Sequence, residues 1–189
     1  MWLRRINIRQ VEGTNFQEVP TQTFSEFKSW MRDNIDAPLL TELFPIGQAL
    51  SDVTWESHDG RIRLPSHLSE QSRDHSIHGR PGITFGRQIG AYPILIGVPY
   101  HVPLERTSDI LVTGHGSRSI TGVEIGLKMN EVTQKQLESI PGIGEKSAWK
   151  LISERVKSAR KGNVYDNIEN WFDTAKVELP PLASQILVK

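Results

Sequence analysis

The stretch Leu137-Glu-Ser-Ile-Pro-Gly-Ile-Gly-Glu-Lys-Ser-Ala-Trp-Lys-Leu-Ile152 decides how the C-terminal part of this sequence folds. It predicts two short helices joined by a tight turn. Thr133 begins a Thr-x-x-Gln capping box at the start of the first helix, and Pro141 ends that helix because proline has no N–H to donate. Gly142 and Gly144 permit a positive φ and leave the backbone open to close approach. We expect the second helix to begin near Gly144.

The start of this second helix is a predicted anion-binding site. The first N–H groups of a helix have no intrahelical acceptor, and the positive end of the helix dipole lies beside them. Gly142, Ile143 and Gly144 would supply the backbone, while Lys146 and Lys150 would add positive charge in the first two turns. A phosphate held in this way carries no base identity, so the pattern predicts nucleic-acid binding without sequence readout.

The charge of the surrounding segment supports the same interpretation. Residues 130–162 contain seven basic and four acidic side chains, a local net charge of +3 in a chain whose formal net charge is zero. The alternative is a helical hairpin that only packs, or one that binds a protein. A plain helical turn requires neither the Gly-x-Gly sequence nor the lysines that follow it.

Ile140-Pro-Gly-Ile-Gly-Glu-Lys-Ser-Ala148, preceded by Asn130 and Leu137, resembles the helix-hairpin-helix motif of DNA- and RNA-binding proteins. The resemblance implies that the hairpin backbone around Gly142–Gly144 contacts phosphate and that Lys146 supports the contact. Glycosylases with this motif carry a catalytic lysine and aspartate in and after it. No matching Gly-Pro-Asp segment follows here, so we do not expect that activity.

Composition limits the remaining function classes. The 189 residues are 37% hydrophobic and 23% charged, which is ordinary for a globular chain. No apolar run approaches the roughly 18 residues that suggest a membrane span, and no apolar segment of a signal peptide follows the basic start of the chain. The chain has no cysteine, so cysteine-ligated zinc and iron–sulfur sites are excluded. We expect a cytoplasmic α+β protein without membrane contact, and no cofactor held by this chain.

The order of the apolar patterns predicts three regions: residues 1–45, 46–127 and 128–189. The first should contain a strand over Trp2–Val11 and a helix over Thr23–Ile35, whose apolar face is expected to pack on a core. The last should be the helical domain that carries the hairpin. Its tail has aromatic and aliphatic residues at helical spacing, which predict a third helix packed on the hairpin: Tyr165, Ile168, Trp171 and Phe172.

The middle region is typical of a small antiparallel, OB-like β-barrel. Five short apolar segments are expected to form its strands: Ala49–Glu56, Ile83–Ile89, Ile94–Val98, Asp109–Thr113 and Ser119–Ile125. Barrels of this kind bind oligonucleotides through basic grooves and exposed aromatics. Arg87 and Arg118 are candidate contacts, and so is Tyr92. The alternative, left open, is that Tyr92 is core and Arg118 only solvates its hairpin.

A polar insertion over residues 57–80 interrupts this predicted barrel. It contains four histidines, namely His58, His67, His75 and His78. Their spacing matches no compact metal-ligand pattern, and no cysteine assists. We therefore expect a surface loop and no metal site.

Leu3–Val11, Phe85–Pro93 and His115–Gly122 precede the hairpin in this order. Together they resemble the C-terminal part of archaeal radical SAM proteins that end in a helix-hairpin-helix. In that family a TIM-type barrel bearing three cysteines precedes a TRAM-like, OB-type barrel thought to hold RNA. The resemblance implies that Trp2–Val11 and Thr23–Ile35 correspond to the last strand and helix of the TIM-type barrel.

The chain departs from that family where the chemistry lies, because it has neither the three cysteines nor the SAM-binding barrel. On its own it is not expected to be an enzyme. The first hypothesis is a module that binds nucleic acid, with RNA favoured over DNA only through the TRAM-like resemblance. The second is an accessory or split C-terminal half, whose partner would be a separate radical SAM barrel protein holding the iron–sulfur cluster and SAM. The third is a protein–protein adaptor.

Overall fold

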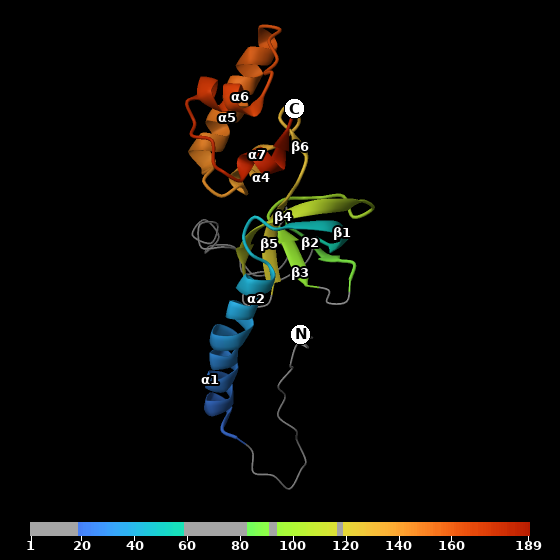
Figure 1. The fold of residues 1–189 in the computed structure, drawn as a ribbon, viewed down its shortest axis with the longest axis vertical. Helices are drawn as coiled ribbons and strands as arrows, with labels where there is room; N and C mark the ends of the chain where they lie inside the picture. The colour runs from blue at the N-terminus through green and yellow to red at the C-terminus, as the bar shows by residue number, and fades with distance from the viewer. Residues whose placement is uncertain (1–18, 59–82, 91–93, 117–118) are drawn as a thin grey trace.

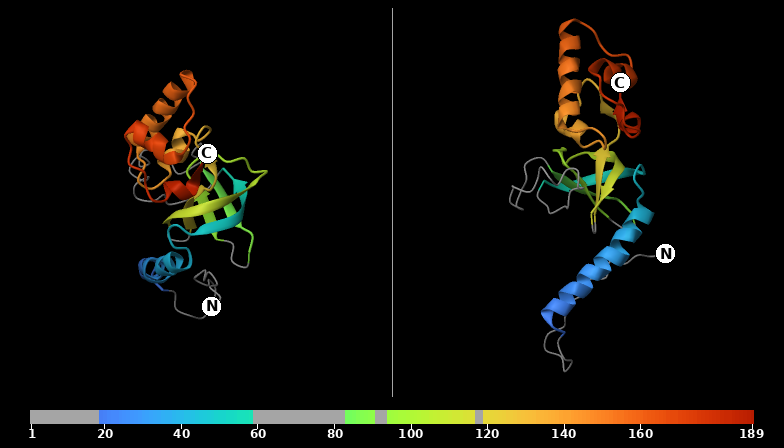
Figure 2. Two further views of the ribbon diagram at one scale, coloured as in Figure 1. Left: turned by 45° about the horizontal axis from the view of Figure 1, so that its top comes forward. Right: turned by 90° about the vertical axis from the view of Figure 1, so that its left-hand side faces the viewer.

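A small β-barrel lies between a long N-terminal helical segment and a group of C-terminal helices (Figure 1). The structure is a computed structural model that describes residues 19–58, 83–90, 94–116 and 119–189. Figure 2 shows from two further directions that the N-terminal and C-terminal helices lie on different sides of the barrel. The strand predicted over Trp2–Val11 lies outside the described residues.

Five strands close the barrel in the order β1-β2-β3-β5-β4. They are β1 (Ala49–Ser57), β2 (Thr84–Gln88), β3 (Leu95–Val98), β4 (Thr107–His115) and β5 (Ser119–Glu124). Each overlaps one of the five predicted segments, and β4 extends beyond its prediction at both ends. The α+β class and the small barrel are therefore confirmed.

The sequence pattern predicted an antiparallel barrel, and this prediction is wrong for one pair of strands. β3 and β5 pair in parallel, with Ile96 opposite Ile120, whereas the other four neighbouring pairs are antiparallel. Strand direction cannot alternate all the way round a closed ring with an odd number of strands. One parallel pair is the smallest departure that closes the ring.

β1 pairs with both β2 and β4 and so completes the closure. Its register against β4 shifts between Leu50 and Val53, and Asp52 in this interval has a φ of 55°. Such a β-bulge bends a strand and increases its twist. The Asp52 N–H donates a hydrogen bond of 3.1 Å to Asp109 Oδ1 on β4, which ties the bend to the neighbouring strand.

Close packing inside the barrel depends on glycine at two strand positions. A Cβ added to Gly122 would lie 2.1 Å from Ile110 Cγ2 on β4, and one added to Gly86 would lie 2.4 Å from the Thr54 carbonyl oxygen on β1. Buried apolar side chains from the strands form the core, and this cluster continues into the C-terminal helices.

A buried polar network joins the loop between β3 and β4, and the start of β4, to the end of β5. The Glu124 side chain is 4% exposed, and its Oε1 accepts hydrogen bonds of 2.6 Å from both Arg106 and Ser108. The Glu124 backbone N–H donates to the Tyr100 hydroxyl at 2.8 Å. Burial, together with the negative charge of Glu124, raises the pKa of Tyr100 well above its ordinary value.

The helix predicted over Thr23–Ile35 has no fully buried residue against the described part of the chain, contrary to the expectation that it packs on a core. The N-terminal helical segment consists of α1 (Thr21–Met31), a π-helical stretch η1 (Arg32–Asp36) and α2 (Ala37–Leu43). No residue of α1 is buried, and Phe27 and Trp30 are 46% and 53% exposed. The spacing of apolar residues predicts an amphipathic helix, but it does not say what covers the apolar face. α2 does reach the barrel, where His115 Nε2–H donates to the Phe44 carbonyl at 2.6 Å.

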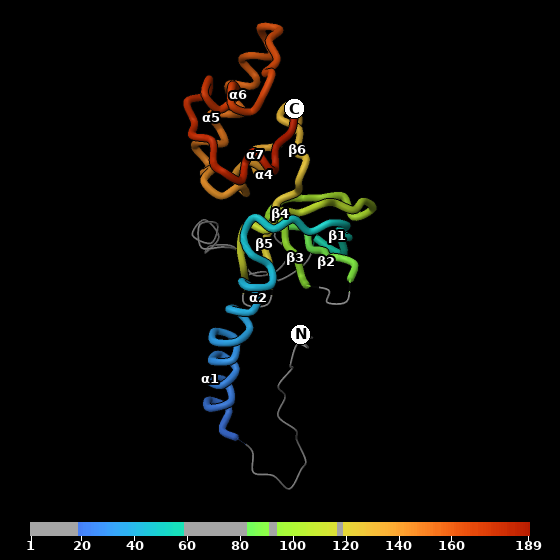
Figure 3. Tube along the Cα trace, viewed as in Figure 1, coloured from blue at the N-terminus to red at the C-terminus, as the bar shows by residue number. Residues whose placement is uncertain are grey.

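The C-terminal helices begin where the chain leaves the barrel (Figure 3). The elements are β6 (Leu127–Lys128), α4 (Gln134–Glu138), α5 (Glu145–Arg160), α6 (Ile168–Ala175), α7 (Ala183–Ile186) and β7 (Leu187–Val188). β7 pairs in parallel with β6 and so returns the C-terminus to the exit of the barrel. The predicted tail helix is present as α6, and its Trp171 is buried and donates to the Leu151 carbonyl at 3.1 Å.

Within the described residues, no helix combines the length and the apolar character required to cross a bilayer.

We predict that Gly122→Ala destabilises the barrel, because the new methyl group would overlap Ile110 on the neighbouring strand. Overpacking of this kind costs about 1–3 kcal/mol, and thermal unfolding should show a Tm lower by roughly 3–10 °C. Gly90→Ala is the control, since nothing lies within 4 Å of a Cβ at that position. Equal melting temperatures for the two variants would contradict the packing described here.

Tyr100→Phe should destabilise the fold by about 1–3 kcal/mol, because the buried Glu124 N–H loses its acceptor. Since folding raises the Tyr100 pKa, its stabilising contribution is complete below an unfolded-state pKa of about 10 and is lost as the pH rises above that value. Urea unfolding at pH 7 and above pH 10 should therefore show a smaller alkaline loss of stability in the variant. Tyr165→Phe serves as control, because the Tyr165 hydroxyl makes only a 3.4 Å contact with Glu154.

Candidate functional site

The helix α4, which leads into the turn of residues 139–144, begins with the capping box that the sequence predicted. Thr133 Oγ1 accepts from the Gln136 N–H at 3.3 Å, and Gln136 Oε1 accepts from the Thr133 N–H at 2.8 Å. This capping box fixes the start of α4. The short helix then delivers the chain into the turn in one defined direction.

Gly142 and Ile143 shape the turn and do not themselves offer side chains to a ligand. Gly142 has a φ of 93°, and a Cβ there would lie 3.0 Å from Pro180. Ile143 is 3% exposed, and its N–H donates to the Ile140 carbonyl at 3.0 Å. The turn is therefore anchored to the core through Ile143 and packed against the chain that precedes α7.

Gly144 leaves the start of α5 open. It is the N-cap of α5, with φ −85° and ψ 172°, and no side chain caps the helix. Its carbonyl accepts the first bond of the helix, from the Ala148 N–H at 2.9 Å, and apart from the adjoining residues of the chain no described atom lies within 4 Å of where a Cβ would stand. Space is therefore open beside Gly144, and the first N–H groups of a helix have no acceptor within the helix, which is the combination at which an anion can bind.

Lys146 and Lys150 lie on the solvent side of this helix start. Both are exposed, and neither makes an ion pair with any residue that the structure describes. Glu145, also exposed in the first turn, offsets part of their charge. The local arrangement is therefore two available ammonium groups beside an uncapped helix start.

Three other basic residues of the segment have partners within the fold. Lys135 pairs with Glu138 at 2.9 Å, and Lys157 lies 3.6 Å from Glu154. Arg155 Nη1 donates to the carbonyls of Met129 and Val132, both at 2.8 Å. Burial lowers the pKa of Arg155. Counting charges along the sequence did not separate these groups from Lys146 and Lys150.

Of the predicted contacts on the barrel, Arg87 alone lies within the described residues. Arg87 lies on β2, where its Nε is 3.2 Å from the Glu56 carboxylate. β2 packs on β1 and β3, and not on α4 or α5. Arg118 and Tyr92 lie outside the described residues. The site that can be built from described residues is therefore the turn together with the first two turns of α5.

Of the four histidines in the polar insertion, His58 lies within the described residues. His58 Nε2–H donates to the Val102 carbonyl at 2.9 Å, and its ring stacks on His101 with centroids 4.0 Å apart. The other three histidines of the insertion lie outside the described residues. Among the described residues, no group of three His, Asp or Glu side chains is placed to hold a metal ion.

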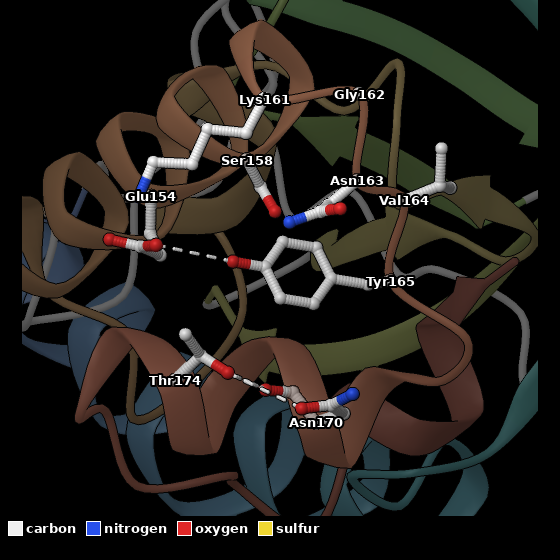
Figure 4. Close-up of a pocket in the computed structure, with 9 residues that line it drawn as sticks. All are labelled: Glu154, Ser158, Lys161, Gly162, Asn163, Val164, Tyr165, Asn170 and Thr174. Atoms are coloured by element: carbon white, nitrogen blue, oxygen red, sulfur yellow. Dashed lines mark hydrogen bonds between the residues drawn. The ribbon is translucent and has the colours of Figure 1, made fainter.

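A hollow of about 540 Å³ lies at the other end of α5, between that helix, the following loop and α6 (Figure 4). The Tyr165 ring points into it, and its hydroxyl contacts Glu154 at 3.4 Å. Thr174 Oγ1 donates to the Asn170 carbonyl at 2.7 Å. Glu154 Oε2 also lies 3.6 Å from Lys157 Nζ, so this carboxylate has a cation and a hydroxyl beside it.

Trp149 was not singled out as a site residue, yet it lies between Lys146 and Lys150 in α5 and is 62% exposed. The sequence contained a signal for it. Ala148 and Leu151 mark the buried side of the helix, so a tryptophan next to Ala148 and three residues after Lys146 falls on the lysine side.

Comparison with known proteins yields two relatives and no assigned function. No protein-family model and no solved structure matches the chain. An uncharacterized protein of Archaeoglobus fulgidus is 33% identical over 150 residues, which cover 74% of this chain and 24% of the relative. An uncharacterized protein of Methanocaldococcus jannaschii is 32% identical over 131 residues, which cover 64% of this chain and 20% of the relative. The chain thus spans about a quarter of the length of the relatives it matches, or less.

Proposed function

We propose that this chain binds the phosphate backbone of nucleic acid, with RNA as the ligand, through the α4–α5 turn and without reading base sequence. The observation that carries the proposal is the open helix start at Gly144: among the described residues no side chain caps it, and none beyond its neighbours in the chain comes within 4 Å of a Cβ at this position. Phosphate binds such a helix start through backbone N–H groups and the helix dipole. Lys146 and Lys150 add charge without base specificity.

The path of the chain through the turn supports a helix-hairpin-helix. A capped short helix, a glycine with positive φ, a buried isoleucine and a second helix follow one another, as the Ile140–Ala148 resemblance implies. In such a hairpin the apolar anchor points inward while the glycine backbone faces the ligand. The burial of Ile143 and the exposure of Gly144 support this arrangement.

The barrel is consistent with a second contact surface for the same ligand. Five strands in the order β1-β2-β3-β5-β4, with β3 parallel to β5, agree with an OB-type barrel. Barrels of this type bind oligonucleotides on the face of strands 2 and 3 and with the loops after strands 1 and 4. Arg87 lies on β2, and Arg118 follows β4 in the sequence.

A second candidate is the nucleic-acid-holding part of a larger enzyme, which the resemblance to radical SAM proteins implies. Two observations favour it. The matched segment is a quarter or less of each relative's length, and the apolar face of α1 is left uncovered by the described residues. In this candidate the face of α1 contacts the SAM-binding part, which would supply the iron–sulfur cluster and SAM.

The test is a fluorescence-anisotropy titration of the chain with single-stranded RNA, duplex DNA of equal length and a folded tRNA at two salt concentrations. We expect binding that weakens as salt rises, with a slope of roughly −0.7 per phosphate contacted on a single strand. The preferred ligand decides RNA against DNA. Absence of binding to all three would contradict the proposal and favour the adaptor.

Gly144→Asp and Gly144→Asn are matched variants: the two new side chains have nearly the same size, and only the aspartate carries a negative charge. Both residues are good N-caps, and φ −85° suits either, so neither should lower the Tm. Asp places a negative charge where the phosphate would lie, and affinity should fall roughly tenfold or more relative to Asn, because a charge-assisted hydrogen bond contributes about 1.5–3 kcal/mol. Equal affinities of the two variants would show that the helix start is not the site.

Lys146→Glu should weaken binding at low salt and reduce the salt slope by about one contact. Lys28→Glu is its control, because it makes the same change in net charge on the exposed side of α1. If both variants lost the same affinity, the effect would come from overall charge and not from the turn.

A further inference from the structure

The outer face of α5 carries a line of side chains that the core does not use. Counting in helical steps from Lys146, the same side receives Lys146, Trp149, Lys150, Ser153, Lys157 and Arg160. Ala148 and Leu151 are buried on the opposite side. At 1.5 Å per residue, the line runs about 21 Å along the helix, a length comparable to several nucleotides of an extended strand.

Trp149 is the unexpected member of this line. It is 62% exposed, whereas Trp55 and Trp171 are 5% and 0% exposed and donate their indole N–H groups to hydrogen bonds. Within the described part of the chain, no hydrogen bond or ring contact involves Trp149. A large aromatic surface is therefore left in water between two ammonium groups.

We propose that Trp149 stacks on an unpaired base of single-stranded RNA whose neighbouring phosphates contact Lys146 and Lys150. The inference rests on the proposed function and narrows its ligand class. Aromatic side chains interleaved with cations are the arrangement by which proteins bind single strands, because every base has a face that can stack. In a duplex the base faces are covered by their neighbours, so the same tryptophan would find no partner there.

The charge around Trp149 favours a nucleic acid over a protein partner. Protein interfaces often bury a tryptophan, but they are depleted in lysine near their centre. Here both neighbouring lysines are exposed and make no ion pair with the described residues. A polyanion would neutralise them while its bases cover the indole.

The experiment compares a fluorescein-labelled RNA of mixed sequence, twelve nucleotides long, alone and annealed to its complement. Trp149→Ala should weaken binding of the single strand about tenfold and leave the duplex within about twofold, while Trp149→Phe should keep most of the affinity. Quenching of tryptophan fluorescence by the single strand should be lost in Trp149→Phe. Trp30→Ala, which removes another exposed tryptophan, is the control and should change neither affinity.

The outcomes separate this inference from the proposed function. If Lys146→Glu weakens binding but Trp149→Ala changes nothing, or weakens strand and duplex equally, the stacking role is overturned and phosphate binding stands. If the unmodified chain binds neither RNA, both fail. If Trp149→Ala instead abolishes capture of a protein and not of RNA, the face of α5 is a protein interface.

Discussion

Closure of a five-stranded barrel is the constraint on which the rest of the structure depends. Because the number of strands is odd, one neighbouring pair must run parallel, and that pair is β3–β5. β1 must also pair on both sides, which it does by bending at Asp52. The ring can close at this small size only where strands come very near each other, and Gly86 and Gly122 occupy such positions.

The same closure places the candidate site. β5 ends at the buried Glu124, and the chain passes directly through β6 into α4 and α5. The C-terminal strand β7 returns to β6, and Arg155 ties α5 to two carbonyls of the segment leaving the barrel. Apolar packing is continuous from the strands to these helices. α5 is therefore held with one side in the core, and its lysines and Trp149 face outward as a result.

The parts that sequence predicts well are those decided by neighbouring residues. The positions of the strands follow from the alternation of apolar and polar residues. The start of α4 follows from the Gln136 side chain, three residues after the cap Thr133, and the turn follows from Pro141, Gly142 and Gly144. The parallel β3–β5 pair is a contact between distant segments, and no local pattern specifies it. The exposed face of α1 could not be predicted either, since an amphipathic helix has the same spacing whether it is covered or not. For the candidate site, sequence singled out Gly144, Lys146 and Lys150. Charge alone could not distinguish these two lysines from Arg155, whose burial depends on the tertiary fold.

The charge balance also bears on how such a site would be used. A chain with formal net charge zero gains little long-range attraction to a polyanion, so binding depends on the few groups at the surface of α5. In the proposed function two lysines and one helix start would contact few phosphates, and non-specific contacts of this kind give dissociation constants of about 10⁻⁴–10⁻⁶ M. Linking a weak site to a second one raises the overall affinity by about 10²–10⁴ without any new contact. Since the relatives are at least four times as long as the segment they share with this chain, a weak and sequence-independent grip fits a part that holds a strand for another part of a larger protein better than it fits a protein that binds alone.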